Sequence, residues 1–160
     1  MCRQPCAVLK KKAMKIVIKT AVQQNYKKVW KGFNQELFEA LKPPLLLLEL
    51  RRFDGSETGD EVHIRLGKGV FSQDWNALII EHGGDEKEHY FIDEGSKLPF
   101  FLKKWKHKHR ILKQSENVST IIDDITYSTP FFLLDYLIYP VMYLQFWARK
   151  PIYKKVFSEE

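Results

Sequence analysis

The residues best suited to chemistry in this 160-residue sequence lie in the segment K-W-K-H-K-H-R-I-L-K at residues 104–113. Cations alternate there with aromatic, imidazole and aliphatic side chains. Successive side chains of a β-strand point to opposite faces, so one face would carry Trp105, His107, His109 and Ile111. The opposite face carries unpaired cations, which are too costly to bury and must be solvated. We therefore predict that the Trp/His face points into the protein.

Two neighbouring segments supply carboxylates to the same interior. Residues 89–93 and 121–127 also alternate, and we assign Asp93 and Asp123 to their inward faces. Arg149 would approach from the C-terminal helix. An apolar cavity with a few convergent polar groups is the usual make-up of a small-molecule pocket. The predicted ligand contacts are Phe91, Asp93, Trp105, His107, His109, Asp123, Tyr127, Tyr143 and Arg149.

Three roles are open for the His and Asp side chains. They could pair with one another as a polar network in the core, or they could contact a bound ligand. They could instead catalyse a reaction, with His107 paired to Asp93 or Asp123 as a general base that removes a proton from an acidic C–H group. Nucleophilic catalysis is not indicated, because the sequence has no G-x-S-x-G motif and its cysteines, Cys2 and Cys6, lie near the N-terminus.

We expect neither a metal nor a cofactor. His107 and His109 would share a strand face, with Asp93 across from it, but their Cβ atoms would lie about 7 Å apart. No distinctive metal-binding spacing is present. The G-K-G of Gly67 and Gly69 is too short for a phosphate-binding loop and predicts a hairpin turn instead.

The element that organises the chain is the apolar run at residues 131–157, which predicts one long helix with a kink at Pro140. Asp135, Gln145 and Arg149 fall within an arc of about 80°, and the rest of the circumference is apolar. Such a helix needs cover from a curved sheet or from a bilayer. A membrane span needs about 20 apolar residues. Asp135 and Pro140 count against a span, so we predict a helix gripped by a sheet.

The remaining pattern predicts an α+β domain at residues 14–160, preceded by a disordered basic tail at residues 1–13. A strand at 14–22 is followed by two short helices at 24–31 and 34–41, with Asn25 and Asn34 as N-caps. Six strands follow, at 45–53, 60–66, 73–81, 86–94, 103–113 and 118–128. We expect a seven-stranded curved antiparallel sheet that holds the long C-terminal helix, which is a helix-grip arrangement.

The composition of the chain gives weaker indications of its cellular location and its binding partners. The net charge of +6 permits an anionic partner. The stripe of Lys104, Lys106, Lys108 and Arg110 could meet phosphates, but the aromatic side chains needed for base stacking lie on the opposite face, so we expect no nucleic acid. Peripheral contact with a membrane surface stays open. We see no signal peptide, and we expect a cytoplasmic location.

Several segments together resemble a known superfamily. F-I-D-E at 91–94, L-P-F at 98–100, W-K-H-K-H at 105–109, I-D-D-I-T-Y-S-T-P at 122–130 and F-W-A-R-K at 146–150 follow the order and spacing of the bacterial ligand-binding branch of the START-like, or SRPBCC, superfamily. Pro44, R-F-D-G at 52–55 and G-D-E-V at 59–62 extend the resemblance upstream. Leu98 replaces a glycine of that pattern, and Trp147 and Ala148 replace its F-x-Y.

The resemblance implies a helix-grip protein related to the birch-pollen allergen. It also implies a hydrophobic cavity between sheet and helix that binds a lipid, a polyketide or a similar apolar or amphipathic molecule. We expect a binding protein rather than an enzyme. An enzyme of the polyketide cyclase or dehydratase kind, which shares this fold, is the alternative; it would use His107 with Asp93 or Asp123.

Overall fold

The structure is a computed structural model that describes residues 13–43 and 47–158. The predicted basic tail lies, except for its last residue, outside the described residues. The same holds for the start of the strand predicted at 45–53.

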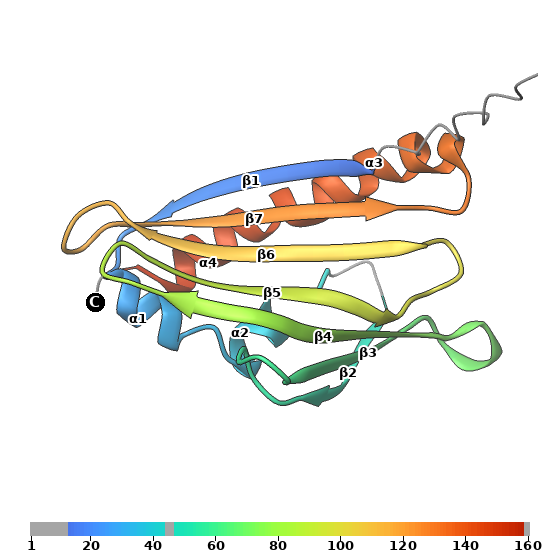
Figure 1. The fold of residues 1–160 in the computed structure, drawn as a ribbon, viewed down its shortest axis with the longest axis horizontal. Helices are drawn as coiled ribbons and strands as arrows, with labels where there is room; N and C mark the ends of the chain where they lie inside the picture. The colour runs from blue at the N-terminus through green and yellow to red at the C-terminus, as the bar shows by residue number, and fades with distance from the viewer. Residues whose placement is uncertain (1–12, 44–46, 159–160) are drawn as a thin grey trace, which may run out of the picture.

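Seven strands form one antiparallel sheet, as predicted (Figure 1). The strands are β1 (Met14–Val22), β2 (Leu48–Phe53), β3 (Glu61–Leu66), β4 (Gln73–Gly84), β5 (Glu88–Lys97), β6 (Lys104–Lys113) and β7 (Ser119–Ser128). Their order in the sheet is β1-β7-β6-β5-β4-β3-β2. Each strand from β2 to β7 therefore pairs with its neighbour in sequence, and β1 closes the order by pairing with β7.

The turn between β4 and β5 lies at residues 85–87 rather than at the glycines just before it. The Asp85 carboxylate accepts hydrogen bonds from the backbone N–H groups of Lys87 and Glu88, at 2.7 and 2.9 Å. An aspartate that bonds to its own following backbone stabilises a turn. β4 therefore begins at Gln73 as predicted but continues through Gly83 and Gly84, and β5 begins and ends later than predicted.

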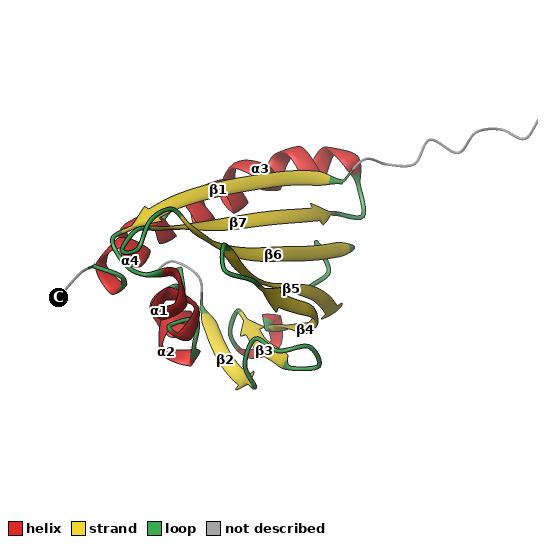
Figure 2. Cartoon of the chain, turned by 60° about the vertical axis from the view of Figure 1, so that its left-hand side comes forward, coloured by secondary structure: helices red, strands yellow, loops and turns green. Residues whose placement is uncertain are grey.

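Two short helices follow β1, as predicted, and the helical C-terminus lies along the sheet (Figure 2). The helical elements are α1 (Tyr26–Lys31), α2 (Gln35–Ala40), the 3-10 turn η1 (Gly69–Phe71), α3 (Phe132–Trp147) and α4 (Arg149–Val156). The predicted caps are confirmed, because the Asn25 side chain accepts from the N–H of Lys27 and the Asn34 side chain from that of Leu37.

The core divides into two apolar clusters. Tyr26, Val29, Tyr153 and Phe157 join α1 and α4 at one end of the sheet. Ile16, Trp105, Tyr127 and Phe146 join α3 to β1, β6 and β7. The C-terminal helices are therefore fixed along the β1/β7 side, and α1 packs on β5, where Trp30 contacts His89 and Phe91.

The C-terminal helical run is interrupted at Ala148, between α3 and α4. Pro140, where we predicted a kink, lies inside α3, and the interruption of the helical run lies at Ala148 instead. Pro151 lies in the first turn of α4, where it has no N–H to donate to the carbonyl of Trp147. Proline is tolerated in the first turn of a helix, so α4 begins as a new helix after Ala148.

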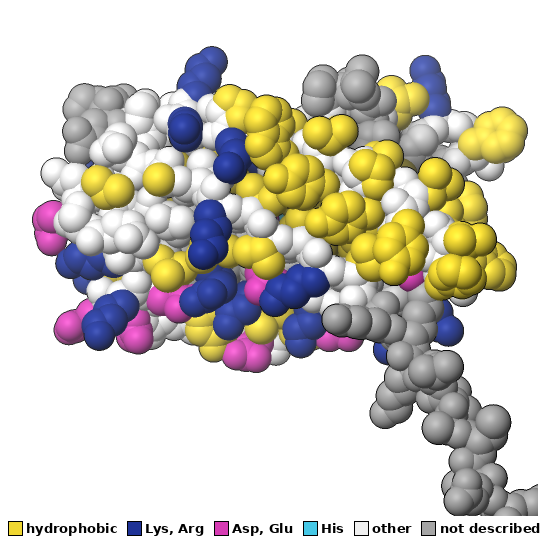
Figure 3. Space-filling view, turned by 90° about the horizontal axis from the view of Figure 1, so that it is seen from above, with side chains coloured by type: hydrophobic (Ala, Val, Ile, Leu, Met, Phe, Trp, Pro, Cys, Tyr) yellow, Lys and Arg dark blue, Asp and Glu magenta, His cyan; other side chains and the backbone are white. Residues whose placement is uncertain are grey.

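The apolar circumference of α3 is much less covered than we predicted. We expected the sheet to cover the apolar circumference, but the buried members of α3 include Asp135, which is 2% exposed. The exposed members are large and apolar: Phe132, Leu133, Tyr136, Leu137, Val141, Tyr143, Leu144 and Trp147. Figure 3 shows these hydrophobic side chains gathered over the helix. We call this surface the α3 outer face.

Asp135 turns inward because it anchors the loop between β7 and α3. Its carboxylate accepts a hydrogen bond from the N–H of Thr129 at 2.7 Å. The backbone carbonyl of the same residue accepts from the Tyr127 hydroxyl at 3.0 Å. Both groups are buried. The first turn of α3 is thereby tied to the end of β7.

Replacing Asp135 with alanine is expected to destabilise the protein by about 1–3 kcal/mol, because the buried N–H of Thr129 loses its acceptor. Urea denaturation of Asp135→Ala measures the change. Leu133→Ala is the matched control on the same helix; Leu133 is 69% exposed, and its loss should change stability by no more than about 0.5 kcal/mol. Equal stability of the two variants would contradict the anchoring role.

Candidate functional site

Two imidazoles and two carboxylates meet on the inner face of three adjacent strands. In the sheet register Asp93 of β5 lies opposite His107 of β6, and His109 of β6 lies opposite Asp123 of β7. The inward orientation predicted for β6 is confirmed, since Trp105, His107 and Ile111 are buried. Burial on β7 likewise places Asp123 inside. We call Asp93, His107, His109 and Asp123 the His/Asp cluster.

Each carboxylate of the cluster bonds to the imidazole that lies diagonally from it. Asp93 Oδ2 lies 3.1 Å from His109 Nε2, and Asp93 Oδ1 accepts a hydrogen bond from Trp105 Nε1 at 2.8 Å. Asp123 Oδ1 lies 3.0 Å from His107 Nε2. The rings of His107 and His109 lie beside each other, with centroids 3.6 Å apart. The four side chains thus form one compact crossed network.

The last helix completes the surroundings of Asp123. The Tyr153 hydroxyl donates to Asp123 Oδ1 at 3.5 Å, and the Arg149 guanidinium approaches the same atom to 3.9 Å. Arg149 also lies over the ring of Phe146, 4.2 Å from its centroid. Its Nε is buried and has no hydrogen-bond partner among the described residues. Arg149 therefore keeps donor capacity that the protein does not use.

Burial and hydrogen bonding decide which groups of the cluster are charged. Burial lowers the pKa of His109 to about 4, with His107 acting in the same direction, so this imidazole is neutral at pH 7. Burial acts to raise the pKa of Asp93, but the hydrogen bond to His109 and the neighbouring imidazoles outweigh it and the pKa is lowered. The pKa of Asp123 is likewise lowered, by His107 and Arg149 against the effect of burial. Both carboxylates are therefore charged.

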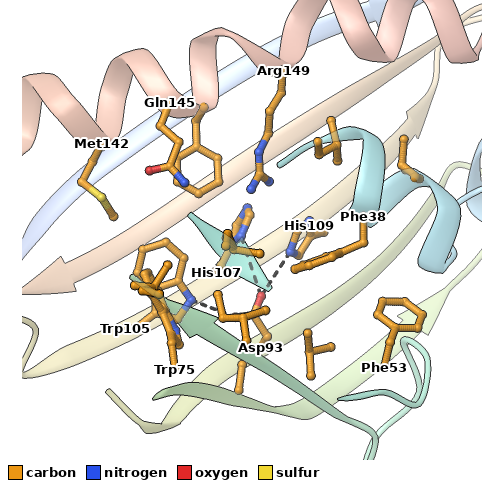
Figure 4. A pocket seen from close by; sticks show the side chains of 18 of the residues that line it. Phe38, Phe53, Trp75, Asp93, Trp105, His107, His109, Met142, Gln145 and Arg149 are labelled. Atoms are coloured by element: carbon orange, nitrogen blue, oxygen red, sulfur yellow. Dashed lines mark hydrogen bonds and ion pairs between the residues drawn. The ribbon is translucent and has the colours of Figure 1, made fainter. Parts of the chain in front are cut away.

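A pocket of about 680 Å³ opens onto this cluster. Its walls come from the inner faces of β2 to β6, from α2 and from the inward sides of α3 and α4. Most lining side chains are apolar, and the polar ones include Asp93, His107, His109, Gln145 and Arg149. In Figure 4, Gln145 and Arg149 point from the helix towards the imidazoles, and Trp75 and Trp105 lie below.

The structure divides the predicted contact residues into three groups. Six of them line the pocket: Phe91, Asp93, Trp105, His107, His109 and Arg149. Asp123 and Tyr127 are fully buried and lie outside the lining, where they hold other residues in place. Tyr143 is 39% exposed and stacks on Tyr139, away from the pocket. At 100° per residue, Tyr143 lies about 160° around the helix from Gln145, so its helical phase already separated it from the polar side.

Several lining residues were missing from the sequence prediction. Tyr153 lies one helical turn after Arg149, a spacing that places both on one side of α4 and could have indicated it. Trp75, whose ring packs edge-on against Trp105 at 4.7 Å, comes from β4. Leu37 and Phe38 of α2 close one end of the pocket. Nothing in the local sequence indicates that Trp75, Leu37 and Phe38 line the pocket, because their position there depends on the curvature of the sheet.

The outer face of β6 carries the predicted cations in a mixed charge environment. Arg110 is paired with Glu88, and the Lys108 ammonium lies 4.2 Å from the ring centroid of Tyr90. On the neighbouring strand Asp124 pairs with Lys15. This face is therefore not a single positive stripe.

Within the described part of the chain, no helix is both long enough and apolar enough to cross a membrane.

Comparison with known proteins gives structural neighbours only. No protein-family model matches the sequence, and no curated protein matches it. Norcoclaurine synthase from Thalictrum flavum is 14% identical, with a TM-score of 0.64 and coverage of 96% of this chain and 100% of that one. A Thermobifida fusca protein solved in solution is 13% identical, with a TM-score of 0.63 and coverage of 91% and 97%.

An aromatase/cyclase from a Streptomyces species is a more distant neighbour. It is 11% identical, with a TM-score of 0.55, and the match covers 74% of this chain and 70% of that one. At these identities the likeness establishes the fold. Together with the sheet order and the placement of the C-terminal helices, it shows that this chain has the helix-grip fold of these neighbours.

Proposed function

We propose that the protein binds a hydrophobic or amphipathic small molecule in the pocket between the sheet and the C-terminal helices. The observation that carries this proposal is the pocket itself. Its volume of about 680 Å³ falls within the range of about 300–1,000 Å³ that is typical of small-molecule sites. Its apolar walls suit a hydrocarbon or aromatic body, and its polar groups gather at one end.

The polar end favours a ligand that carries an anion or a strong hydrogen-bond acceptor. The Arg149 guanidinium faces the pocket and has an unused donor, and Gln145 lies beside it. An acceptor placed there would satisfy a buried donor, which contributes more than a new contact at the surface. Among the structural neighbours, norcoclaurine synthase has been solved with dopamine and hydroxybenzaldehyde, which are aromatic molecules with polar substituents.

Arg149→Met is expected to weaken binding of anilinonaphthalene sulfonate, an aromatic anion, about tenfold or more, because a charge-assisted hydrogen bond is lost while the apolar walls remain. Fluorescence titration measures the affinity. Lys150→Met is the matched control, since it removes the adjacent cation, which lies outside the pocket lining. If the two variants lose the same affinity, the loss comes from the change in net charge, and the proposed polar end is contradicted.

A second candidate function is an enzyme that uses His107 as a general base. The favouring observation is the buried contact between His107 Nε2 and Asp123, which would fix the ring with Nδ1 directed to the pocket side of the cluster. Asp123 would then stabilise the imidazolium formed when Nδ1 takes a proton. Aromatase/cyclase activity in a protein of the same fold is consistent with such chemistry.

If this candidate holds, His107→Gln should lower turnover of a poly-β-carbonyl thioester by a factor of about 10²–10⁴, while the glutamine amide keeps a donor for Asp123. Single-turnover product analysis provides the measurement. His89→Gln is the control, because His89 stacks on Tyr26 and Trp30 outside the pocket. Turnover that survives in the His107 variant would exclude the general-base role.

We further infer that the protein meets its apolar ligand at an anionic membrane surface through the α3 outer face. Between Phe132 and Trp147, all within the described residues, the one charged side chain is the buried Asp135. Exposed Lys154 and Lys155 continue the helical run, and the chain carries a net charge of +6. Aromatic and aliphatic side chains beside lysines are typical of interfacial helices.

The α3 outer face also adjoins the pocket. Leu137 and Val141 are largely exposed on α3, and both belong to the pocket lining. A ligand that leaves a membrane under this face would therefore pass from one apolar environment to another. Exposed apolar patches of this extent mark interaction sites on soluble domains.

Leu133→Gln combined with Leu144→Gln should reduce partitioning onto phosphatidylglycerol-containing vesicles about tenfold or more, because two exposed apolar side chains would no longer be buried in the interface. Vesicle sedimentation gives the partition coefficient. Val70→Gln with Phe71→Gln is the matched control, since both residues are highly exposed on η1, away from α3.

Light scattering of the same samples distinguishes a membrane from a second copy of the chain. We expect a monomer in which the α3 substitutions change only vesicle binding. A dimer that dissociates on the same substitutions, with no vesicle binding by the original protein, would show that this face joins two copies and would overturn the membrane proposal.

A further inference from the structure

Three side chains of the His/Asp cluster direct one ligand atom each towards a common point on the pocket wall. Asp93 Oδ2 lies 3.1 Å from His109 Nε2 and 3.7 Å from His107 Nδ1. One ligand atom from each of the three residues lies within 4.8 Å of the other two. Donor atoms around a zinc-sized ion with bonds of about 2.1 Å are separated by about 3.0–3.5 Å, so a small inward movement would complete the set.

The outer atoms of the same three side chains are held by a second set of partners. His107 Nε2 contacts Asp123 Oδ1, and Trp105 Nε1 donates to Asp93 Oδ1. His109 Nδ1 is buried, lies 3.8 Å from Asp123 Oδ1, and has no hydrogen-bond partner among the described residues. Metal-binding imidazoles characteristically present their other nitrogen to a carboxylate, which fixes the tautomer and orients the ring.

The orphaned nitrogen of His109 distinguishes this arrangement from a closed polar network. If Nε2 carries the proton for Asp93, then Nδ1 is a buried acceptor without a donor. If Nδ1 carries the proton, it points at Asp123, and Nε2 presents a lone pair to the negatively charged oxygen of Asp93. A cation between Nε2 and Oδ2 resolves the second case, because it accepts both lone pairs and lets Nδ1–H point at Asp123.

The charge balance of the site also admits a cation. Asp93 and Asp123 are two buried carboxylates, and among the described residues the guanidinium of Arg149 approaches Asp123. The negative charge of Asp93 is therefore balanced less directly than that of Asp123. Phe91 stacks on His109 at 4.2 Å and limits access of water from that direction.

We propose that Asp93, His107 and His109 bind one divalent transition-metal ion, of the Zn²⁺ or Fe²⁺ class, at the wall of the pocket. Two imidazoles and one carboxylate are ligands that these ions favour over Mg²⁺ or Ca²⁺. The remaining coordination positions face the pocket, where a ligand oxygen could bind. Asp123 and Trp105 act as positioning residues that hold the imidazoles and the carboxylate in place.

From the sequence we expected no metal at His107 and His109. The distance of about 7 Å between alternate Cβ atoms on a strand seemed too large for a shared ion. The rings of His107 and His109 instead lean towards each other, with centroids 3.6 Å apart. The general base of the second candidate function would use the same Nδ1 of His107, so a bound metal and a proton are alternatives at that atom.

Titration of metal-free protein with Co²⁺, followed by its visible absorption, tests the proposal. All samples carry Cys2→Ser and Cys6→Ser, so that thiols cannot supply the ligands. We expect one ion per chain, with an affinity that falls at least a hundredfold in Asp93→Asn and in His109→Phe. Asp123→Asn should weaken binding about tenfold to a hundredfold, as loss of an outer partner does. His89→Phe is the matched control and should bind as the Cys2→Ser/Cys6→Ser parent does.

Thermal denaturation with and without Zn²⁺ gives a second readout, because an ion that binds only the folded state raises the melting temperature by mass action. The rise should occur in the parent protein and in His89→Phe, and should be absent in Asp93→Asn and His109→Phe. No absorption bands in the parent, or bands that survive in both variants, would overturn the proposal. Anilinonaphthalene sulfonate binding to metal-free protein is measured separately, so failure of the metal site is distinguishable from failure of the pocket.

Discussion

The rest of the site depends on one constraint, the burial of two carboxylates and two imidazoles on the inner face of the sheet. Charged groups in such a place must be paired and hydrogen-bonded. Asp93 and Asp123 meet this requirement through diagonal contacts to His109 and His107, made across three neighbouring strands. The register of β5, β6 and β7 is therefore fixed by polar contacts as well as by the backbone ladder, because a slip of one residue would turn every one of these side chains to the solvent.

The same constraint accounts for the orientation of the C-terminal helices. Arg149 and Tyr153 approach Asp123 from α4, and Asp135 is held at the other end by the loop after β7. These polar anchors face the sheet, so the remaining apolar circumference of α3 faces outward. A single helix therefore contributes to the lining of a pocket with one side and presents an exposed apolar surface with the other. The same helix therefore serves both the pocket and the exposed apolar surface.

Much of the fold could be predicted from the sequence because the patterns involved are local. Alternation along residues 104–113 identified the inward face of β6, and Asn25 and Asn34 identified the starts of α1 and α2. The break at Ala148 was not predicted, because both Pro140 and Pro151 lie in the apolar run and only the observed helix bounds distinguish them. The outward apolar face of α3 was missed for a similar reason. Its direction follows from tertiary anchors rather than from the amount of apolar surface.

The seven-stranded α+β arrangement and the inward side chains of β6 could be predicted from local patterns, since strand alternation and helix capping act over a few residues. Tertiary structure alone decided which carboxylate meets which imidazole, how closely the rings of His107 and His109 approach, and that Trp75, Leu37 and Phe38 wall the pocket. Strand register, sheet curvature and side-chain tilt set these distances. These distances are between segments that are far apart in the chain, so no local sequence pattern predicts them.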